Sequence, residues 1–299
     1  MQYGVTAYPA SRRGGLHAPY RTRIRIGEEP LLSKKPPFRD RPASERLALA
    51  KARADKLVHH IVPLFLMHEA NALIIYSQQL SGQIPRSRAA HAFNQFQRSM
   101  HLFEIIRLCA IWDKPSEDRE SIPTIIALLD DPALIDQLAR EAYAFHSNEA
   151  SSDGFNRDDN AQQTSGKSWW RQDRQSVARQ VEEGIRQKLS FAIEEAAKIQ
   201  KSLRLKALMD FRHRNIAHNL DLPEPDMKLD ASVAKVKYGD EGIILKNTVA
   251  VADALHHGLN ETAFDWNGSR EIARMNARAL WDSCTFQIQT RPPLSAAPR

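Results

Sequence analysis

Residues 88–112, with the sequence RAAHAFNQFQRSMHLFEIIRLCAIW, form the clearest helical pattern in the chain. Apolar residues recur in this stretch at spacings of three and four, which is the repeat of an α-helix with one apolar face. The residues of this stripe are Ala89, Ala92, Phe93, Phe96, Met100, Phe103, Ile106 and Ala110. We predict a helix that ends near residues 113–115 and whose apolar stripe packs in the protein core.

The rest of the chain shows further helical patterns of the same kind. They span about residues 47–80, 123–129, 132–146, 170–208, 243–255 and 269–284. Ser44 and Ser269 are the predicted caps of the first and last of these helices, and Pro63 is expected to kink or split the first. Residues 233–238 alternate apolar and polar, which indicates a short strand. About seven helices with one apolar face each favour an all-α fold, an antiparallel helical bundle.

Composition separates the predicted bundle, residues 44–288, from its flanks. Residues 1–43 are rich in Pro, Gly and Arg, which predicts a disordered basic tail, and residues 289–299 are predicted to be a loose tail. Within the bundle, the polar residues 147–168 predict a mobile loop. Residues 1–46 contain ten Lys or Arg and four Asp or Glu, a difference that equals the whole chain's net charge of +6. This basic segment either binds RNA phosphates or is an unfolded leader.

The composition also excludes several classes of protein. The chain has 299 residues, of which 42% are hydrophobic, enough to bury a substantial core. It has neither a P-loop nor a dinucleotide fingerprint, and its histidines follow no helical metal-site motif, so we expect no cofactor and no metal. No segment resembles a membrane span or a signal peptide, which predicts a cytoplasmic protein without a membrane partner.

A cluster of cationic and imidazole side chains occupies residues 211–219, FRHRNIAHN. Arginine is a permanent cation that binds phosphate through two parallel hydrogen bonds, and histidine titrates near neutral pH, so the cluster suits acid–base chemistry on a phosphodiester. Arg214 and Asn215 precede His218 by four and three residues, which places them near it on a helix. An alternative is that Arg212 and Arg214 complement the dipole at a helix C-terminus and that His218 caps it.

The cluster resembles the signature of the HEPN superfamily, in which an arginine is followed by a polar residue and, after a spacer, by a histidine that a small residue precedes. Arg212, His213 and His218 fill these places. The ending at residues 216–219 and the upstream segment 107–115, RLCAIWDKP, are similar to the abortive-infection AbiU-type branch. This branch resemblance extends over about residues 45–285.

The resemblance implies a metal-independent endoribonuclease of a toxin–antitoxin or abortive-infection phage-defence system. It further implies a homodimer whose two motifs face one cleft, with RNA as substrate and an antitoxin as a possible partner. His218 would act as base or acid, Arg212 would clamp the phosphate, and His213 would orient one of them, with Arg214 and Asn215 contacting the substrate. The alternative is a noncatalytic HEPN-like helical module that binds a partner protein or a nucleotide.

Overall fold

The computed structural model describes residues 38–148, 166–213 and 236–288, and for residues 166–172 it describes the backbone alone. Within this part of the chain the structure is all-α, as predicted, and it contains no strand. The helices are α1 (Ala43–Tyr76), α2 (Gln78–Gly82), α3 (Arg88–Ile111), α4 (Ile122–Leu128), α5 (Pro132–Ser147), α6 (Gly166–Gln200), α7 (Leu203–Arg212), α8 (Asp240–Asn260) and α9 (Trp266–Trp281).

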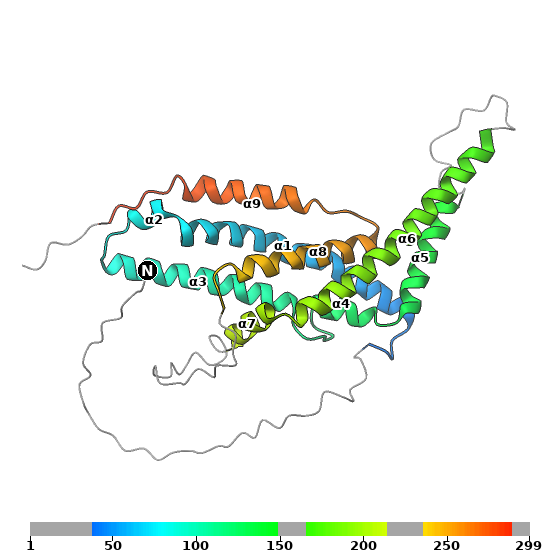
Figure 1. Cartoon of the computed structure of the whole chain (residues 1–299), viewed down its shortest axis with the longest axis horizontal. Helices are drawn as coiled ribbons and strands as arrows, with labels where there is room; N and C mark the ends of the chain where they lie inside the picture. The colour runs from blue at the N-terminus through cyan, green and yellow to red at the C-terminus, as the bar shows by residue number, and fades with distance from the viewer. Residues whose placement is uncertain (1–37, 149–165, 214–235, 289–299) are drawn as a thin grey trace, which may run out of the picture. The chain divides into compact units, whose positions relative to one another are not determined.

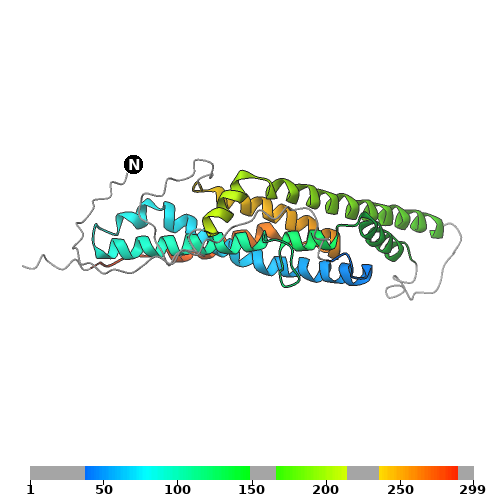
Figure 2. The ribbon, with the colours of Figure 1, turned by 90° about the horizontal axis from the view of Figure 1, so that it is seen from below.

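Helix α1 is the central element, with α3, α8 and α9 packed along it (Figure 1). The α1–α3 pair is antiparallel, because Gln97 bonds to the carbonyl of Ile74 near one end, whereas His68 bonds to Glu104 farther along. Helices α5 and α6 form a second pair, and α6 packs against α8 (Figure 2). The buried side chains of these helices form one continuous apolar core.

Helix α3 forms where the sequence predicts it, but it buries a different face. Phe96, Phe103 and Ala110 of the predicted core stripe are exposed. The residues that α3 buries are Glu104, Ile105, Leu108, Cys109 and Ile111. Both faces of α3 are apolar, and α1 packs on the second one, so the pattern alone could not decide which face becomes core. The consequence is an apolar stripe on the outer face of α3.

The fold begins before the predicted boundary at residue 44. Phe38, which falls in the predicted tail, is 1% exposed and belongs to the core. Arg39 and Arg46 both pair with Asp130, and Arg46 also donates a hydrogen bond to the carbonyl of Leu128. Part of the basic segment is therefore bound to acidic groups of the bundle, and its charge does not all lie in an appendage. The other predictions for the flanks and the loop concern residues that the structure does not describe, namely 1–37, 149–165 and 289–299.

Three helix boundaries differ from the prediction, and at two of them a side chain other than the predicted one caps the helix. Helix α1 begins after Pro42, not at Ser44, and α9 is capped by Asp265, whose side chain accepts a hydrogen bond from the Gly268 amide, not by Ser269. The predicted helix over 170–208 is two helices, because Ser202 caps a new one by accepting from the Leu205 amide. The described part of the predicted strand at 233–238 forms no strand, because Val236 and Lys237 adopt no regular structure and Tyr238 lies in a turn.

Among the described helices, α1 alone is long and apolar enough to cross a membrane, with a mean hydropathy of 1.3 over 18 residues. This differs from the sequence-based expectation that no segment reaches that length and apolarity. In the structure α1 packs against α3, α4, α8 and α9. That setting is compatible with the core helix of a soluble protein.

A buried polar network crosses the α1–α3 interface. Glu104 accepts hydrogen bonds from Asn71, with a distance of 2.6 Å between Nδ2 and Oε2, and from the Nδ1 atom of His68 at 2.7 Å. Burial alone lowers the pKa of His68, but the hydrogen bond and the charge of Glu104 outweigh it and raise the pKa above 6.5. This pair stabilises the fold fully below about pH 6.5, and the stabilisation is lost as the pH rises through the raised pKa.

Replacing Glu104 with glutamine is expected to lower the pKa of His68 from its raised value, because the charge of Glu104 no longer opposes the effect of burial. An NMR titration of the imidazole signals measures this change directly. A Glu141→Gln variant, altered at an exposed position of α5, serves as the control. An unchanged titration of His68 in the Glu104→Gln protein would contradict the assignment of the raised pKa to this pair.

Candidate active site

Arg212 of the predicted motif lies at the end of α7, where it binds the end of α3. Leu205 and Leu208 anchor α7 in the core. This packing directs Arg212 to Asp113, and the distance between Nη2 and Oδ1 is 2.7 Å. The two side chains are only 17% and 22% exposed. The sequence cluster is thus joined to a carboxylate that lies 99 residues earlier in the chain.

His213, the second motif residue, is exposed and follows Arg212 at the C-cap of α7. Its backbone amide bonds to carbonyls of the last helical turn. The other three predicted site residues, Arg214, Asn215 and His218, fall outside the described residues. The structure therefore places Arg212 and His213 at the end of one helix and leaves the positions of the remaining three as predictions.

Hydrogen bonds hold Asp113 and the following loop in place. The Trp112 side chain, next to Asp113, donates to Thr248 of α8 at 2.8 Å. The Ser121 hydroxyl donates to the carbonyl of Asp113 at 2.9 Å, and Ser121 also caps α4. Both ends of the loop are thereby fixed to the core, so the carboxylate that holds Arg212 is positioned by rigid elements.

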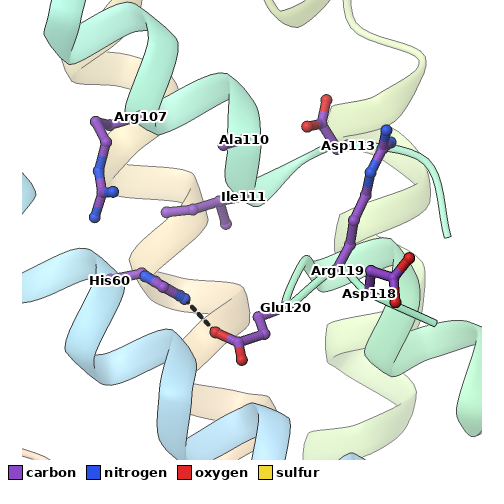
Figure 3. A pocket seen from close by; sticks show the side chains of 8 residues that line it. All are labelled: His60, Arg107, Ala110, Ile111, Asp113, Asp118, Arg119 and Glu120. Atoms are coloured by element: carbon purple, nitrogen blue, oxygen red, sulfur yellow. Dashed lines mark hydrogen bonds and ion pairs between the residues drawn. The ribbon is translucent and has the colours of Figure 1, made fainter. Parts of the chain in front are cut away.

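A pocket of about 240 Å³ adjoins this ion pair. It lies between α1 and α3 and is closed by the loop that joins α3 to α4 (Figure 3). The residues that line it are His60, Arg107, Ala110, Ile111, Asp113, Asp118, Arg119 and Glu120. Asp113 therefore belongs both to the pocket and to the ion pair with Arg212. Arg212 stands at the border of a cavity in which five of the eight lining side chains are charged.

Two side chains of α1 converge on Glu120 at the floor of the pocket. His60 Nε2 lies 2.7 Å from Glu120 Oε2, and Lys56, one turn earlier, pairs with the other carboxylate oxygen. The hydrogen bonds from Lys56 and then His60 hold the pKa of Glu120 below its ordinary value. A charged Glu120 orients the imidazole ring, because it fixes which ring nitrogen faces the carboxylate.

The two arginines that line the pocket, Arg107 and Arg119, form no ion pair among the described residues. Arg107 has no hydrogen-bond or ion-pair partner among the described residues, and Arg119 makes one hydrogen bond, to the backbone carbonyl of Lys114. Figure 3 shows Arg107 reaching from α3 toward α1 on the side of His60, with Arg119 on the side of Asp113. Guanidinium groups that keep free donors suit the binding of phosphate oxygens.

Cys109 lies close to the ion pair but is unsuited to nucleophilic chemistry. It is completely buried, and burial raises the pKa of its thiol to about 12. The thiol therefore stays protonated near neutral pH. Within the described residues there is also no group of three or more His, Cys, Asp or Glu side chains arranged to hold a metal ion.

The sequence alone did not predict a site role for His60 and Glu120 or the pairing of Asp113 with Arg212. His60 is one of the histidines that follow no helical metal-site motif, and Glu120 lies in a polar loop with no motif. Arg107 and Asp113 begin and nearly end the segment 107–115 that carried the branch resemblance. A signal was therefore present, since the two segments similar to one family meet in space.

The AbiU2 model of the HEPN families matches residues 55–280 of the chain. No curated protein and no solved structure matches it significantly. The matched span covers well over half of the chain and includes the pocket, Asp113 and Arg212. The chain therefore belongs to the AbiU2 family of HEPN proteins.

Proposed function

We propose that this protein is a metal-independent endoribonuclease that acts as a toxin or as an abortive-infection effector in phage defence. Membership of the AbiU2 family supports a role related to abortive infection. The observation that carries the catalytic part of the proposal is the position of Arg212, which borders a pocket that contains further arginines and an oriented histidine.

In the proposed reaction, the 2′-hydroxyl of the ribose attacks the adjacent phosphorus, and the 5′-oxygen of the next nucleotide leaves. His218 takes the hydroxyl proton or protonates the leaving oxygen, and Arg212 stabilises the negative charge of the crowded phosphorane. His213 orients one of these groups, and Arg214 and Asn215 contact the RNA. Asp113 acts as a positioning residue, because its bond to Arg212 fixes the direction of the guanidinium.

Within the part of the chain that the structure describes, the ion pair uses only a small part of the binding capacity of Arg212. A guanidinium group has five N–H donors, and Asp113 takes one of them in a single hydrogen bond. The remaining donors are sufficient for two parallel bonds to phosphate oxygens. The same pairing also favours the noncatalytic alternative, in which Arg212 and its neighbours bind a nucleotide or partner protein without cleaving RNA.

We further propose that the active form is a cytoplasmic homodimer, restrained in the cell by an antitoxin partner. The exposed stripe of α3, made of Phe96, Phe103 and Ala110, is the surface that supports the dimer. Arg107 lies on the same helix, one turn after Phe103, and lines the pocket. Because a two-fold dimer uses the same patch twice, contact along this stripe would bring two copies of the pocket to one interface.

The proposal is tested by incubating the purified protein with total RNA and with tRNA in the presence of EDTA, beside a His218→Ala variant. Wild-type protein is expected to cleave RNA without a divalent metal, and the variant is expected to be inactive. Loss of wild-type cleavage on chelation would contradict the metal-free reaction. Equal cleavage by both proteins would indicate a contaminating nuclease, and binding without any cleavage would favour the noncatalytic alternative.

A further inference from the structure

The geometry points to the pocket between α1 and α3 as the binding site for a nucleotide of the RNA that adjoins the scissile bond, with Arg107 and His60 holding its phosphate. The inference rests on the proposed function only for the identity of RNA as the natural ligand. Nucleotide binding in the pocket stands on the side chains that line it.

The charges of the side chains that line the pocket favour an anionic ligand. Two of its three acids form ion pairs, Asp113 with Arg212 and Glu120 with Lys56. Among the described residues the third acid, Asp118, forms no ion pair, and neither do the lining cations Arg107 and Arg119. Two unpaired cations therefore stand against one unpaired acid, and an anionic ligand would balance the excess positive charge.

The guanidinium group of Arg107 is available to a ligand in the pocket. Among the described residues Arg107 has no partner, so in the unliganded protein its donors are left to solvent and are available to the acceptors that a ligand supplies. Arg107 is only partly exposed, so the surface does not simply hold it in bulk water. A phosphate group provides the acceptors and the negative charge that a guanidinium binds with two parallel hydrogen bonds.

His60 has one ring nitrogen available for a ligand. Its Nε2 atom bonds to Glu120, so Nδ1 is the ring nitrogen left for another partner. In the protonated imidazole both ring nitrogens donate hydrogen bonds, and Nδ1 can then donate to a phosphate oxygen while Glu120 holds the other side of the ring. His60 and Arg107 lie on the same side of the pocket, as Figure 3 shows, so one phosphate could engage both.

The size and position of the pocket agree with a phosphate and part of one nucleotide. Its volume of about 240 Å³ lies below the roughly 300–1,000 Å³ of sites that enclose drug-sized ligands. Asp113, which pairs with Arg212, lies on the opposite side of the pocket from Arg107 in Figure 3. A phosphate at Arg212 and a second at Arg107 would belong to neighbouring positions of one RNA strand.

The test measures binding without cleavage. Full-length protein is titrated by calorimetry with adenosine 5′-monophosphate, with uridine 5′-monophosphate and with inorganic phosphate. The Arg107→Ala change is expected to weaken nucleotide binding by about tenfold or more, and His60→Ala by a smaller factor, since each removes a charge-assisted hydrogen bond. Arg98→Ala removes an exposed arginine from the same helix and is expected to leave binding within about twofold of the wild type. Thermal melting checks that each variant folds.

A second measurement links the pocket to RNA. In the His218→Ala background, a short single-stranded RNA should lose affinity by a similar factor when Arg107 is also replaced. Wild-type affinity in the Arg107→Ala protein, or an equal loss in Arg98→Ala, would overturn the inference. So would a loss of nucleotide binding with unchanged RNA binding, because the pocket would then be a site for free nucleotides. If wild-type protein binds nucleotides through Arg107 but never cleaves RNA, the proposed function fails and the binding site stands.

Discussion

Replacing Arg212 with alanine is expected to lower the rate of RNA cleavage by about a hundredfold to a thousandfold, the usual cost of removing one group that stabilises a developing oxyanion. The fold should survive the change. The Arg212–Asp113 pair is partly exposed, and its loss removes one charged hydrogen bond at the edge of the core. We expect the free energy of unfolding to fall by about 1–2 kcal/mol.

The chain offers a matched control on the same helix. Arg204 also lies on α7 and also pairs with an aspartate, Asp240, with 3.2 Å between Nε and Oδ1. Arg204→Ala removes an equivalent charge and ion pair but is remote from the pocket lining, so it should cleave RNA at the wild-type rate. Initial rates on a fluorescent RNA in EDTA, with melting curves for each variant, provide the comparison. Wild-type activity in Arg212→Ala would remove this residue from the mechanism.

A lysine at position 212 separates charge from geometry. Lysine keeps a cation for Asp113 but lacks the planar fork that binds two phosphate oxygens. The Arg212→Lys protein should therefore be as stable as the wild type and yet remain well below it in activity. A fully active lysine variant would mean that only the charge matters.

Introducing a glutamate at Phe103 is expected to dissociate the proposed dimer and to abolish cleavage with it. Phe103 is 50% exposed in the single chain, in the middle of the outer stripe of α3. A charge buried without a partner in an interface core costs about 2 kcal/mol or more, which weakens association by about 30-fold or more. Sedimentation velocity at several concentrations measures the change in mass, and the same samples give the cleavage rate.

Phe191→Glu is the control for this experiment. Phe191 is 46% exposed on α6, so the same substitution is made at a similarly exposed phenylalanine outside the stripe. This variant should remain dimeric and active. A wild-type protein that sediments as a monomer at all concentrations, or a dimer that persists in Phe103→Glu, would contradict the α3 interface.

The helices themselves could be predicted from the sequence because their apolar spacing is local information. Their partners could not. In α3 two apolar faces compete, and only the packing of α1, α7 and α8 decides that Leu108 and Cys109 become core while Phe103 is exposed. Similarly, Ser202 lies within an unbroken apolar repeat, and the helix nevertheless ends and restarts there because the serine side chain satisfies an amide of the next helix.

The candidate site could be predicted only in part. Arg212 and His213 were recognised from a short motif that follows one helix, and the structure places both at its end. The partner of Arg212 could not be found in this way, because Asp113 comes from another helix and meets Arg212 only through the tertiary fold. The same is true of His60 and Glu120, which belong to different elements and become a pair only when α1 packs beside the α3–α4 loop.

The ion pair between Asp113 and Arg212 also sets the time at which the site comes into being during synthesis. His60, Arg107 and Asp113 leave the ribosome well before α7. The Trp112 side chain can donate its hydrogen bond to Thr248 only after α8 has been synthesised. A nascent chain that ends before these helices contains every residue that lines the pocket but lacks Arg212. A chain too short to include α7 therefore lacks the proposed phosphate clamp of the endoribonuclease.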